Sequence, residues 1–330
     1  MKAREPDLIA RIGHGASSNP TLSLPLGIGD DAALFAAKPG FQTILTCDWF
    51  LEGSHFLRDR HPADAAGWKC LARAVSDVAA MGGEPRCFLL SLALPPSRTG
   101  RWLNEFLLGL QRAARRFKCP LVGGDTTQRQ EILINVTVVG EVRAGRAVLR
   151  SGARSGDIIF VSGRLGEAEA GLRLVRGKGS VRINKKDPTL RKHFYPEPRI
   201  ALGRYLSDGR IATAMMDLSD GLSSDLPRLC AASGVGARIA AAQLPAVEMT
   251  ARRGAKKAEA LDPLDLALNG GDDYELLFTV PPSKARRLPR GFQGIPLTAI
   301  GEITRQRSLA LVHSDGREET IRSGGWDPFR

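Results

Sequence analysis

Aspartate residues recur at the ends of short apolar runs in this chain. The first pair, Asp30-Asp31, follows Gly27-Ile28-Gly29, where two glycines free the backbone to bend. The other aspartates of this kind are Asp48, Asp125, Asp217 and Asp220, with Asp77 added on a predicted helix. Neighbouring carboxylates repel one another, so a fold that gathers them needs a cation between them. Each aspartate alone is an ordinary turn residue, but the recurrence favours a shared cation site.

Strands and helices alternate imperfectly along the sequence. Apolar residues at helical spacing predict helices at residues 6–12, from 61–64 to 81, at 102–117, 165–175 and 199–206, and from Asp220 to about Gly234. Strands are expected at residues 41–45, 87–94, 121–122, 132–139, 157–161, 211–216, 236–240 and 274–280. Because strands slightly outnumber helices, the pattern favours α/β architecture with mixed α+β layers over a strictly parallel sheet.

The length of 330 residues favours two domains over one. Residues 140–156 are rich in Arg, Gly and Ser, so we expect the boundary there, between domains 1–145 and 146–330.

The cellular compartment is indicated by what the sequence lacks. No run approaches the roughly 18 apolar residues of a membrane span, and residues 1–13 hold no apolar signal segment. Five cysteines are scattered without a C-x-x-C pair, as is typical of buried thiols in a reducing compartment. We therefore expect a cytoplasmic protein with no membrane association.

Positive charge is concentrated in the middle of the chain. The net charge is +12, and residues 141–210 contain 16 Lys and Arg against 7 Asp and Glu. Such a field suits anionic partners, either nucleic acid or small polyphosphates, although a solvated loop between Arg176 and Lys192 is the preferred interpretation. An RNA-binding protein is the alternative from another class. The 6% aromatic content and the lack of a nucleic-acid motif argue against it, so no nucleic-acid partner is expected.

Two common phosphate-binding motifs do not account for the chain. No G-x-x-x-x-G-K-[ST] sequence occurs, which excludes a P-loop. Gly27-x-Gly29-x-x-Ala32 matches the loose dinucleotide fingerprint, with Asp48 at about the distance of its ribose-binding acid. However, only residues 32–37 separate these glycines from Pro39, which is too short for the helix of a βαβ unit. The oxidoreductase interpretation therefore fails.

The type of ligand indicates the type of metal. Aspartates without a His/Cys set favour a hard cation such as Mg²⁺, and several such ions imply a nucleoside triphosphate. Plain structural roles remain open for three residues. Asp77 could pair with Arg73 one turn earlier, Asp220 could cap the helix that follows it, and His55 could be a turn histidine.

Seven ordered motifs carry a resemblance to a known family. They are GIGDDAAL, T-x-D-x-x-x-EGSHF, GWK-x-LA-x-x-x-SD-x-AAMG, GGDTT, R-x-GA-x-x-GD, DLSDGL-x-x-DL and GG-x-DYELLFTV. In this order they resemble the thiamine-monophosphate kinases, from about Gly27 to Val280, with a further match at residues 325–329. Seven ordered motifs are highly specific, unlike any one alone.

The resemblance implies a fold and an activity. It implies the fold of aminoimidazole ribonucleotide synthetase, with an N-terminal domain that binds ATP and Mg²⁺ and dimerises through its sheet. A C-terminal domain closes over the active site. It also implies a homodimeric kinase that uses ATP and several Mg²⁺ ions to convert thiamine monophosphate to thiamine diphosphate, a step of thiamine biosynthesis.

Roles for single residues follow from the same motifs. The implied metal contacts are Asp31, Thr46, Cys47, Asp48, Asp77, Asp125, Asp217 and Asp220, of which Asp48, Asp125 and Asp217 are expected to be catalytic. The implied ATP contacts are Gly124, Asp125, Arg150 and Ser219. The implied substrate contacts are His55, Asp272 and Trp326.

The chain departs from the family pattern at three places. Cys47 stands where a second threonine is usual, Gln128-Arg129 where the family has an arginine or a glycine-rich continuation, and Asp272 where glutamate is usual. The change at Asp272 leaves open a divergent superfamily member that phosphorylates or activates another small substrate. Two specific kinds of relative are disfavoured. Hydrogenase-maturation proteins carry a cysteine near the C-terminus and selenide dikinases carry a reactive one in the N-terminal segment, whereas this chain has neither a cysteine near its C-terminus nor one before Cys47.

Overall fold

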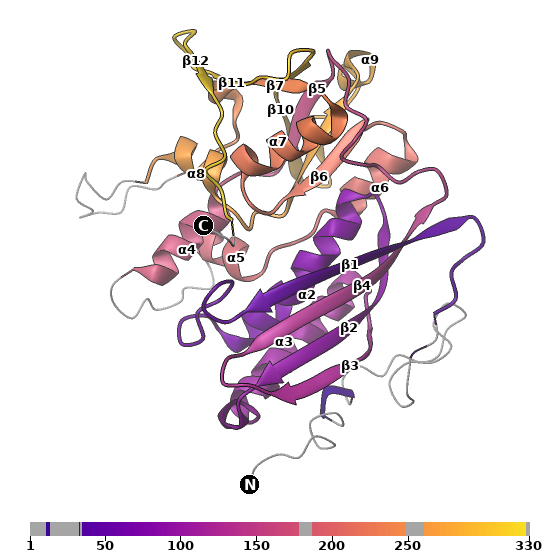
Figure 1. Cartoon of the computed structure of the whole chain (residues 1–330), viewed down its shortest axis with the longest axis vertical. Coiled ribbons are helices and arrows are strands. Elements are labelled where there is room, and N and C mark those ends of the chain that lie inside the picture. The colour runs from indigo at the N-terminus through magenta and orange to yellow at the C-terminus, as the bar shows by residue number, and fades with distance from the viewer. Residues whose placement is uncertain (1–10, 14–32, 34, 178–186, 249–260, 328–330) are drawn as a thin grey trace. The chain divides into compact units, whose positions relative to one another are not determined.

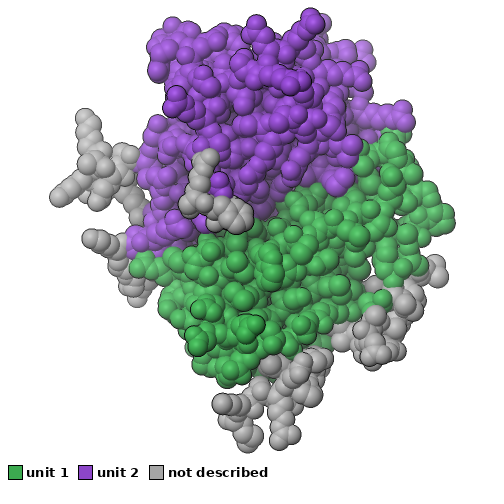
Figure 2. Space-filling view, in the orientation of Figure 1, with its two compact units in different colours: residues 1–79, 83–147 green, residues 80–82, 148–330 purple. Residues whose placement is uncertain are grey.

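The computed structural model describes residues 11–13, 33, 35–177, 187–248 and 261–327. The chain divides into two units, one of residues 1–79 and 83–147 and the other of residues 80–82 and 148–330 (Figure 2). The glycine–aspartate stretch at residues 27–32, with Asp31, lies outside the described residues.

A four-stranded sheet forms the first unit, with strand order β1-β4-β2-β3 (Figure 1). The strands are β1 (Phe41–Leu51), β2 (Glu84–Leu94), β3 (Leu121–Gln128) and β4 (Leu133–Arg143). β4 pairs antiparallel with both β1 and β2, whereas β2 and β3 run parallel. β1 and β3 therefore form the two edges of this sheet.

Two helices, α2 (Ala63–Ala80) and α3 (Arg101–Phe117), cover one face of that sheet, and the short η1 (Pro96–Arg98) precedes α3 (Figure 1). The apolar stripe of α3 is buried, as its spacing predicts. Glycines let the helix backbones meet: a Cβ on Gly67 would lie 2.0 Å from the Phe106 carbonyl oxygen, and one on Gly109 would lie 1.8 Å from that of Asp64.

The opposite face of the sheet exposes large apolar side chains. Leu45 is 71% exposed, Trp49 56% and Leu89 39%. Neither α2 nor α3 covers this side, which we call the open face. Among the described residues, Ala33 and Phe35 pack against it, beside Cys87, Val122 and Val139.

An eight-stranded sheet forms the second unit, with order β12-β11-β7-β10-β5-β8-β6 and β9 paired to β10. The strands are β5 (Ile158–Ser162), β6 (Ala214–Leu218), β7 (Gly236–Ala240), β8 (Glu275–Val280), β9 (Gly291–Phe292), β10 (Ile295–Thr304), β11 (Leu309–Val312) and β12 (Glu318–Thr320). β11 and β7 pair parallel, and the other pairs run antiparallel. This mixed pairing confirms the predicted mixed α/β layers.

Helices pack on both faces of the second sheet. They are α4 (Glu167–Arg176), α5 (Pro188–Phe194), α6 (Ile200–Asp208), α7 (Leu222–Ser233), α8 (Pro263–Asn269) and α9 (Pro282–Ala285), with the short η2 (Ala241–Gln243). Leu226 of α7 joins the core cluster that contains Val161, whereas Leu206 of α6 joins Phe160 on the other face. Alternation along β5 thus supplies both cores.

Two sequence predictions about local structure are wrong. The strands predicted at residues 41–45, 121–122 and 211–216 end too early, since Asp48, Asp125 and Asp217 lie inside β1, β3 and β6. Pairing with neighbouring strands overrides the low strand propensity of Gly and Asp. The supposed basic loop at residues 176–192 ends in α5, where Asp187 caps the helix by accepting the N–H groups of Thr189 and Leu190. Residues 178–186 lie outside the described residues.

Across the described ranges, no helix combines the length and the apolar character that crossing a membrane requires. All five cysteines are free thiols.

Candidate active site

Thr46 and Asp77 meet on the helix-covered side of the first sheet. The Thr46 hydroxyl donates to Asp77 Oδ2 of α2 at 2.5 Å. Strand alternation sets Asp48 on the same face as Thr46 and the buried Phe50. Three of the expected metal contacts, all with oxygen atoms that could ligate a cation, therefore lie on this side of the sheet.

Cys47 and Asp125 lie on the open face instead. The Asn135 amide donates to Cys47 Sγ at 3.1 Å, and Cys47 and Asp125 are both exposed. In the sheet register, Asp48 aligns with Val136, Leu90 and Gly124, and Asp125 lies in the next row. Three strand spacings separate β1 from β3, or roughly 14 Å. One chain alone therefore does not bring Asp125 to Asp48 as neighbouring ligands.

Gly124 adopts a backbone conformation that suits glycine, with φ 155°. A Cβ there would lie 1.9 Å from the Leu90 carbonyl oxygen. The close approach of β2 and β3 at this row thus depends on the glycine, and it leaves the backbone beside Asp125 uncovered by a side chain.

His55 is held in the turn after β1. The Leu51 N–H donates to His55 Nδ1 at 3.0 Å, and the imidazole lies 5.9 Å from the Phe50 ring. Because Nδ1 accepts, the neutral ring carries its proton on Nε2. The turn role considered for this histidine is observed.

In the second unit, a tight turn after β6 carries Ser219 and Asp220. Asp217 lies one residue before the end of the same strand, with only 3% exposure. Oδ2 of the buried Asp225 accepts the N–H groups of both Ser219 and Asp220 at 3.1 Å. Arg228 contacts Asp225 Oδ1 at 2.8 Å and Asp220 Oδ2 at 2.5 Å. The proposed capping role of Asp220 is wrong, since the N-cap of α7 is Gly221 without a side-chain cap.

Three successive carbonyl groups of this turn accept hydrogen bonds from the expected substrate segments. Leu218 accepts from the Tyr274 N–H at 2.8 Å and Ser219 from the Asp272 N–H at 2.8 Å, while Asp220 accepts from the Trp326 N–H at 3.0 Å. The Tyr274 hydroxyl also donates to Asp272 Oδ1 at 2.7 Å. The fold therefore brings Ser219, Asp220, Asp272 and Trp326 together.

The backbone of Arg150 lies at the C-terminal end of α7, whereas Ser219 and Asp220 lie at its N-terminal end. Its carbonyl accepts from the hydroxyl of Ser233, the last residue of that helix, at 2.9 Å. A helix of 12 residues spans about 18 Å, so the backbone of Arg150 is not beside Ser219. Its side chain is exposed.

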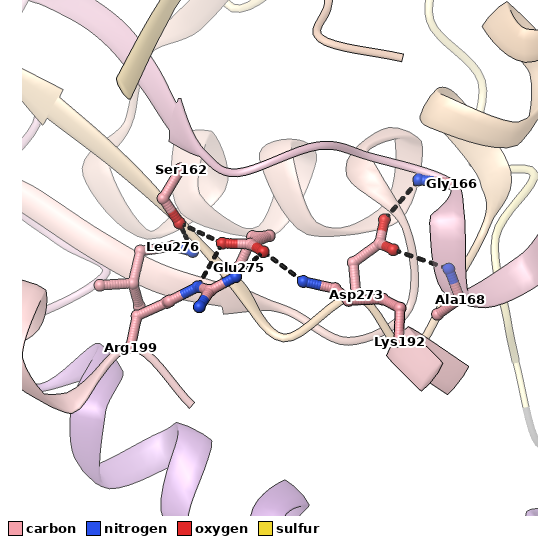
Figure 3. A network of polar contacts seen from close by, with 8 residues as sticks. All are labelled: Ser162, Gly166, Ala168, Lys192, Arg199, Asp273, Glu275 and Leu276. Atoms are coloured by element: carbon pink, nitrogen blue, oxygen red, sulfur yellow. Dashed lines mark hydrogen bonds and ion pairs between the residues drawn. The ribbon is translucent and has the colours of Figure 1, made fainter. Parts of the chain in front are cut away.

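Two buried carboxylates next to Asp272 organise the same region (Figure 3). Asp273 accepts the N–H groups of Gly166 and Ala168, at 2.6 and 3.2 Å, at the start of α4. Glu275 pairs with Lys192 and Arg199 and accepts from the Ser162 hydroxyl at 2.6 Å. The Arg199 Nε–H donates to Glu275 Oε2 at 2.6 Å. These contacts tie α4, α5 and the residues before α6 to the start of β8.

The pKa values of the buried carboxylates Asp225, Asp273 and Glu275 differ from the ordinary values. Burial, with a smaller effect of the Asp220 charge, raises the pKa of Asp225 to about 6. Burial raises the pKa of Asp273 to about 7. Burial alone would also raise the pKa of Glu275, but Lys192 and Arg199 outweigh it and hold that pKa below its usual value.

Sequence reasoning assigned no role to Asp225, Asp273 or Glu275. All three lie inside quoted motifs, DLSDGL-x-x-DL and GG-x-DYELLFTV. A signal was therefore present, but only burial and hydrogen bonding distinguish a carboxylate that supports a turn from one that contacts a ligand.

The donor atoms suit a hard cation. Carboxylate and hydroxyl oxygens from Thr46, Asp48 and Asp77 are the type that Mg²⁺ takes, whereas the Cys47 thiol is not. Within the part of the chain that the structure describes, no group of three or more His, Cys, Asp or Glu side chains is arranged to hold a metal ion. Asp31 lies outside that part.

Family models match most of the chain. The model of the AIR synthase related protein N-terminal domain covers residues 29–142, and that of the C-terminal domain covers residues 154–314.

Curated relatives match over the full length. The chain is 39% identical to the thiamine-monophosphate kinase of Escherichia coli (strain K12), covering 100% of this chain and 99% of that one. It is 34% identical to the thiamine-monophosphate kinase of Bacillus subtilis (strain 168), covering 93% and 94%.

Solved structures agree with the curated relatives. The thiamine-monophosphate kinase from Stenotrophomonas maltophilia K279a matches with a TM-score of 0.79 and 35% identity, over 94% of this chain and 96% of that one. AaThiL complexed with AMPPCP and TMP matches with a TM-score of 0.76 and 33% identity, over 98% and 97%. The hydrogenase maturation protein HypE of E. coli has a TM-score of 0.76 at only 20% identity, over 95% and 96%, so it shares the fold alone.

Proposed function

The chain belongs to the thiamine-monophosphate kinase family, and we propose that it transfers the γ-phosphate of ATP to thiamine monophosphate, giving thiamine diphosphate. The observation that carries this proposal is the match to AaThiL complexed with AMPPCP and TMP, over 98% of this chain. In this chain, ATP would take the place of AMPPCP, and thiamine monophosphate would be the phosphate acceptor.

The chemistry requires charge neutralisation more than proton transfer. A phosphate oxygen of the acceptor is already ionised near neutral pH, so the reaction needs no general base. Two anions must instead be brought together in line, which positioned cations and hydrogen-bond donors achieve.

We assign the binding of Mg²⁺ to the carboxylates and hydroxyls of the motifs. The set comprises Asp31, Thr46, Asp48, Asp77, Asp125, Asp217 and Asp220, with Cys47 as a weaker contact. Bound Mg²⁺ would neutralise the phosphate oxygens. The hydrogen bond from Thr46 to Asp77 supports a common role for these two residues, and Asp48, Asp125 and Asp217 are assigned to catalysis.

ATP and the acceptor are assigned to adjoining segments. Gly124, Asp125, Arg150 and Ser219 would contact ATP, whereas His55, Asp272 and Trp326 would contact thiamine monophosphate. The backbone contacts of Ser219 with Asp272, and of Asp220 with Trp326, support a donor and an acceptor that lie next to each other.

We further infer a homodimer formed through the open face of the first unit. Leu45, Trp49 and Leu89 present apolar surface there, which would gain stability from burial. A partner sheet packed on this face with reversed strand order would bring its β3 edge over β1. The separation of Asp125 from Asp48 in one chain supports this arrangement. The free cysteines support a reducing compartment, the cytoplasm.

The decisive experiment measures product formation with purified protein. Thiamine monophosphate, ATP and Mg²⁺ should give thiamine diphosphate and ADP, and excess EDTA should abolish the reaction. Undiminished turnover in EDTA would contradict the role of the cation, and ADP formation only with another acceptor would support a divergent substrate.

A further inference from the structure

The turn at Leu218–Asp220 is fixed from two sides. Asp225 accepts its two N–H groups, Ser219 and Asp220, as described above. All three of its carbonyls accept from Asp272, Tyr274 and Trp326. The backbone that would present Ser219 and Asp220 to the nucleotide is therefore shaped by residues of the acceptor side.

One of these acceptor segments, Ser323–Trp326, which we call the strap, crosses the start of α7. The Ser323 and Ser224 hydroxyls lie 2.9 Å apart, and the Gly324 N–H donates to Ser223 Oγ at 3.1 Å. Ser223 in turn donates to Asn269 Oδ1 at 2.7 Å. Hydrogen bonds thus hold the strap at Ser323, Gly324 and Trp326.

Gly325 is the point of closest approach. A Cβ on this residue would lie 1.9 Å from the Asp220 carbonyl oxygen and 2.6 Å from Ser224 Oγ. The first of these atoms belongs to the backbone and cannot turn aside. Any side chain at this position must therefore push the strap off the turn and break the bond from the Trp326 N–H to Asp220.

We propose that the strap, through Gly325 and the Trp326 N–H, is a positioning element for the nucleotide-binding turn, in addition to any contact of the Trp326 ring with the acceptor. This inference rests on the proposed function, because it takes Ser219 and Asp220 as the donor-side contacts. It separates two roles of one residue: the indole ring serves the acceptor, and the backbone serves the nucleotide.

The test uses binding of AMPPCP with Mg²⁺ to the full chain, measured by calorimetry without acceptor. Gly325→Ala keeps the indole ring but displaces the strap, so AMPPCP affinity should fall at least tenfold. Trp326→Ala removes the ring and keeps the N–H, so AMPPCP affinity should stay within about twofold while the KM for thiamine monophosphate rises. Equal AMPPCP affinity in Gly325→Ala and wild type would overturn the proposal.

A milder variant guards against loss of folding in Gly325→Ala. Ser323→Ala lies on the exposed strap and removes the hydroxyl that contacts Ser224. A neutral hydrogen bond is worth about 0.5–1.5 kcal/mol, so AMPPCP affinity should fall roughly 2- to 10-fold. An unchanged AMPPCP affinity in Ser323→Ala would count against the positioning role of the strap. If wild type binds AMPPCP but does not phosphorylate thiamine monophosphate, the acceptor assignment fails, and the comparison of AMPPCP affinities still decides the role of the strap.

Discussion

Asp48 and Asp125 lie at opposite edges of one four-stranded sheet and on its opposite faces. Asp48 shares the helix-covered side with Thr46, whereas Asp125 is exposed on the open face, one register row away. If both belong to one reaction centre, that centre needs a second copy of the chain.

Trp49→Asp should convert the protein from dimer to monomer, because it puts a charge on the apolar open face in place of a large exposed apolar side chain. Light scattering after gel filtration measures the mass, and turnover should fall with the loss of the dimer. Leu108→Asp is the matched control, since Leu108 is 58% exposed on α3, away from the open face. A Trp49→Asp dimer with normal activity would place the interface elsewhere.

Asp125→Asn should lower kcat by roughly 10²–10⁴, because it keeps the shape of the side chain but removes the charge that a cation needs. Stability should not fall, since Asp125 is exposed and asparagine keeps the size of the side chain. Steady-state kinetics at saturating ATP and a thermal melt measure the two effects. Turnover near that of wild type would remove Asp125 from the mechanism.

Asp272→Glu should leave the KM for thiamine monophosphate equal or lower, with the KM for ATP unchanged, if this carboxylate meets the acceptor. Glutamate restores the longer side chain that is usual in the family. The backbone at Asp272 has φ 68°, which costs glutamate slightly more than aspartate. An effect confined to the KM for ATP would show that Asp272 serves the other ligand.

Glu275→Gln should lower the free energy of unfolding by about 3–5 kcal/mol, because it leaves Lys192 and Arg199 without their shared buried partner. Chemical denaturation measures this, and adding Lys192→Met should recover part of the loss. The pKa of Glu275 is lowered on folding, so its stabilisation is present above about pH 4.5 and is lost as the pH falls through the folded value. If the losses in unfolding free energy of Glu275→Gln and Lys192→Met simply added in the double variant, the two side chains would act independently.

Asp273 should produce the opposite dependence on pH. Its pKa rises from 3.8 to about 7 on folding, chiefly through burial, so the folded state holds a proton that the unfolded state has released. The stability that this proton supports is complete below about pH 3.8 and is lost as the pH rises through 7. Relative to Asp273→Asn, wild type should therefore lose up to about 1.4 kcal/mol per pH unit between pH 5 and 7. Parallel curves for the two proteins would refute the raised pKa.

Regular periodicity made much of the fold predictable. The helices α2 and α3 follow their apolar spacing, and Gly82-Gly83 marks the end of the first. β10 was not predicted, because Pro296 and Gly301 interrupt it and its burial does not alternate. A register shift between Ala299 and Gly301 explains the irregular pattern.

Long-range contacts account for most of what the sequence did not show. Helix α5 is short and basic, and its Lys192 pairs with Glu275, 83 residues further on. No local pattern encodes that contact. Likewise, motif matching grouped Cys47 with Asp48, although neighbouring residues of a strand point to opposite faces of the sheet.

The strand order β1-β4-β2-β3 has a consequence for synthesis on the ribosome. β1 and β2 have no hydrogen bonds to each other, since β4 lies between them and pairs with both. Roughly 90 residues must follow β1 before β4 is complete, which takes about 5–20 s at ordinary rates of elongation. During that interval β1, with Leu45 and Trp49, has no strand to join, so the nascent chain exposes an unpaired apolar segment that a ribosome-associated chaperone would have reason to cover.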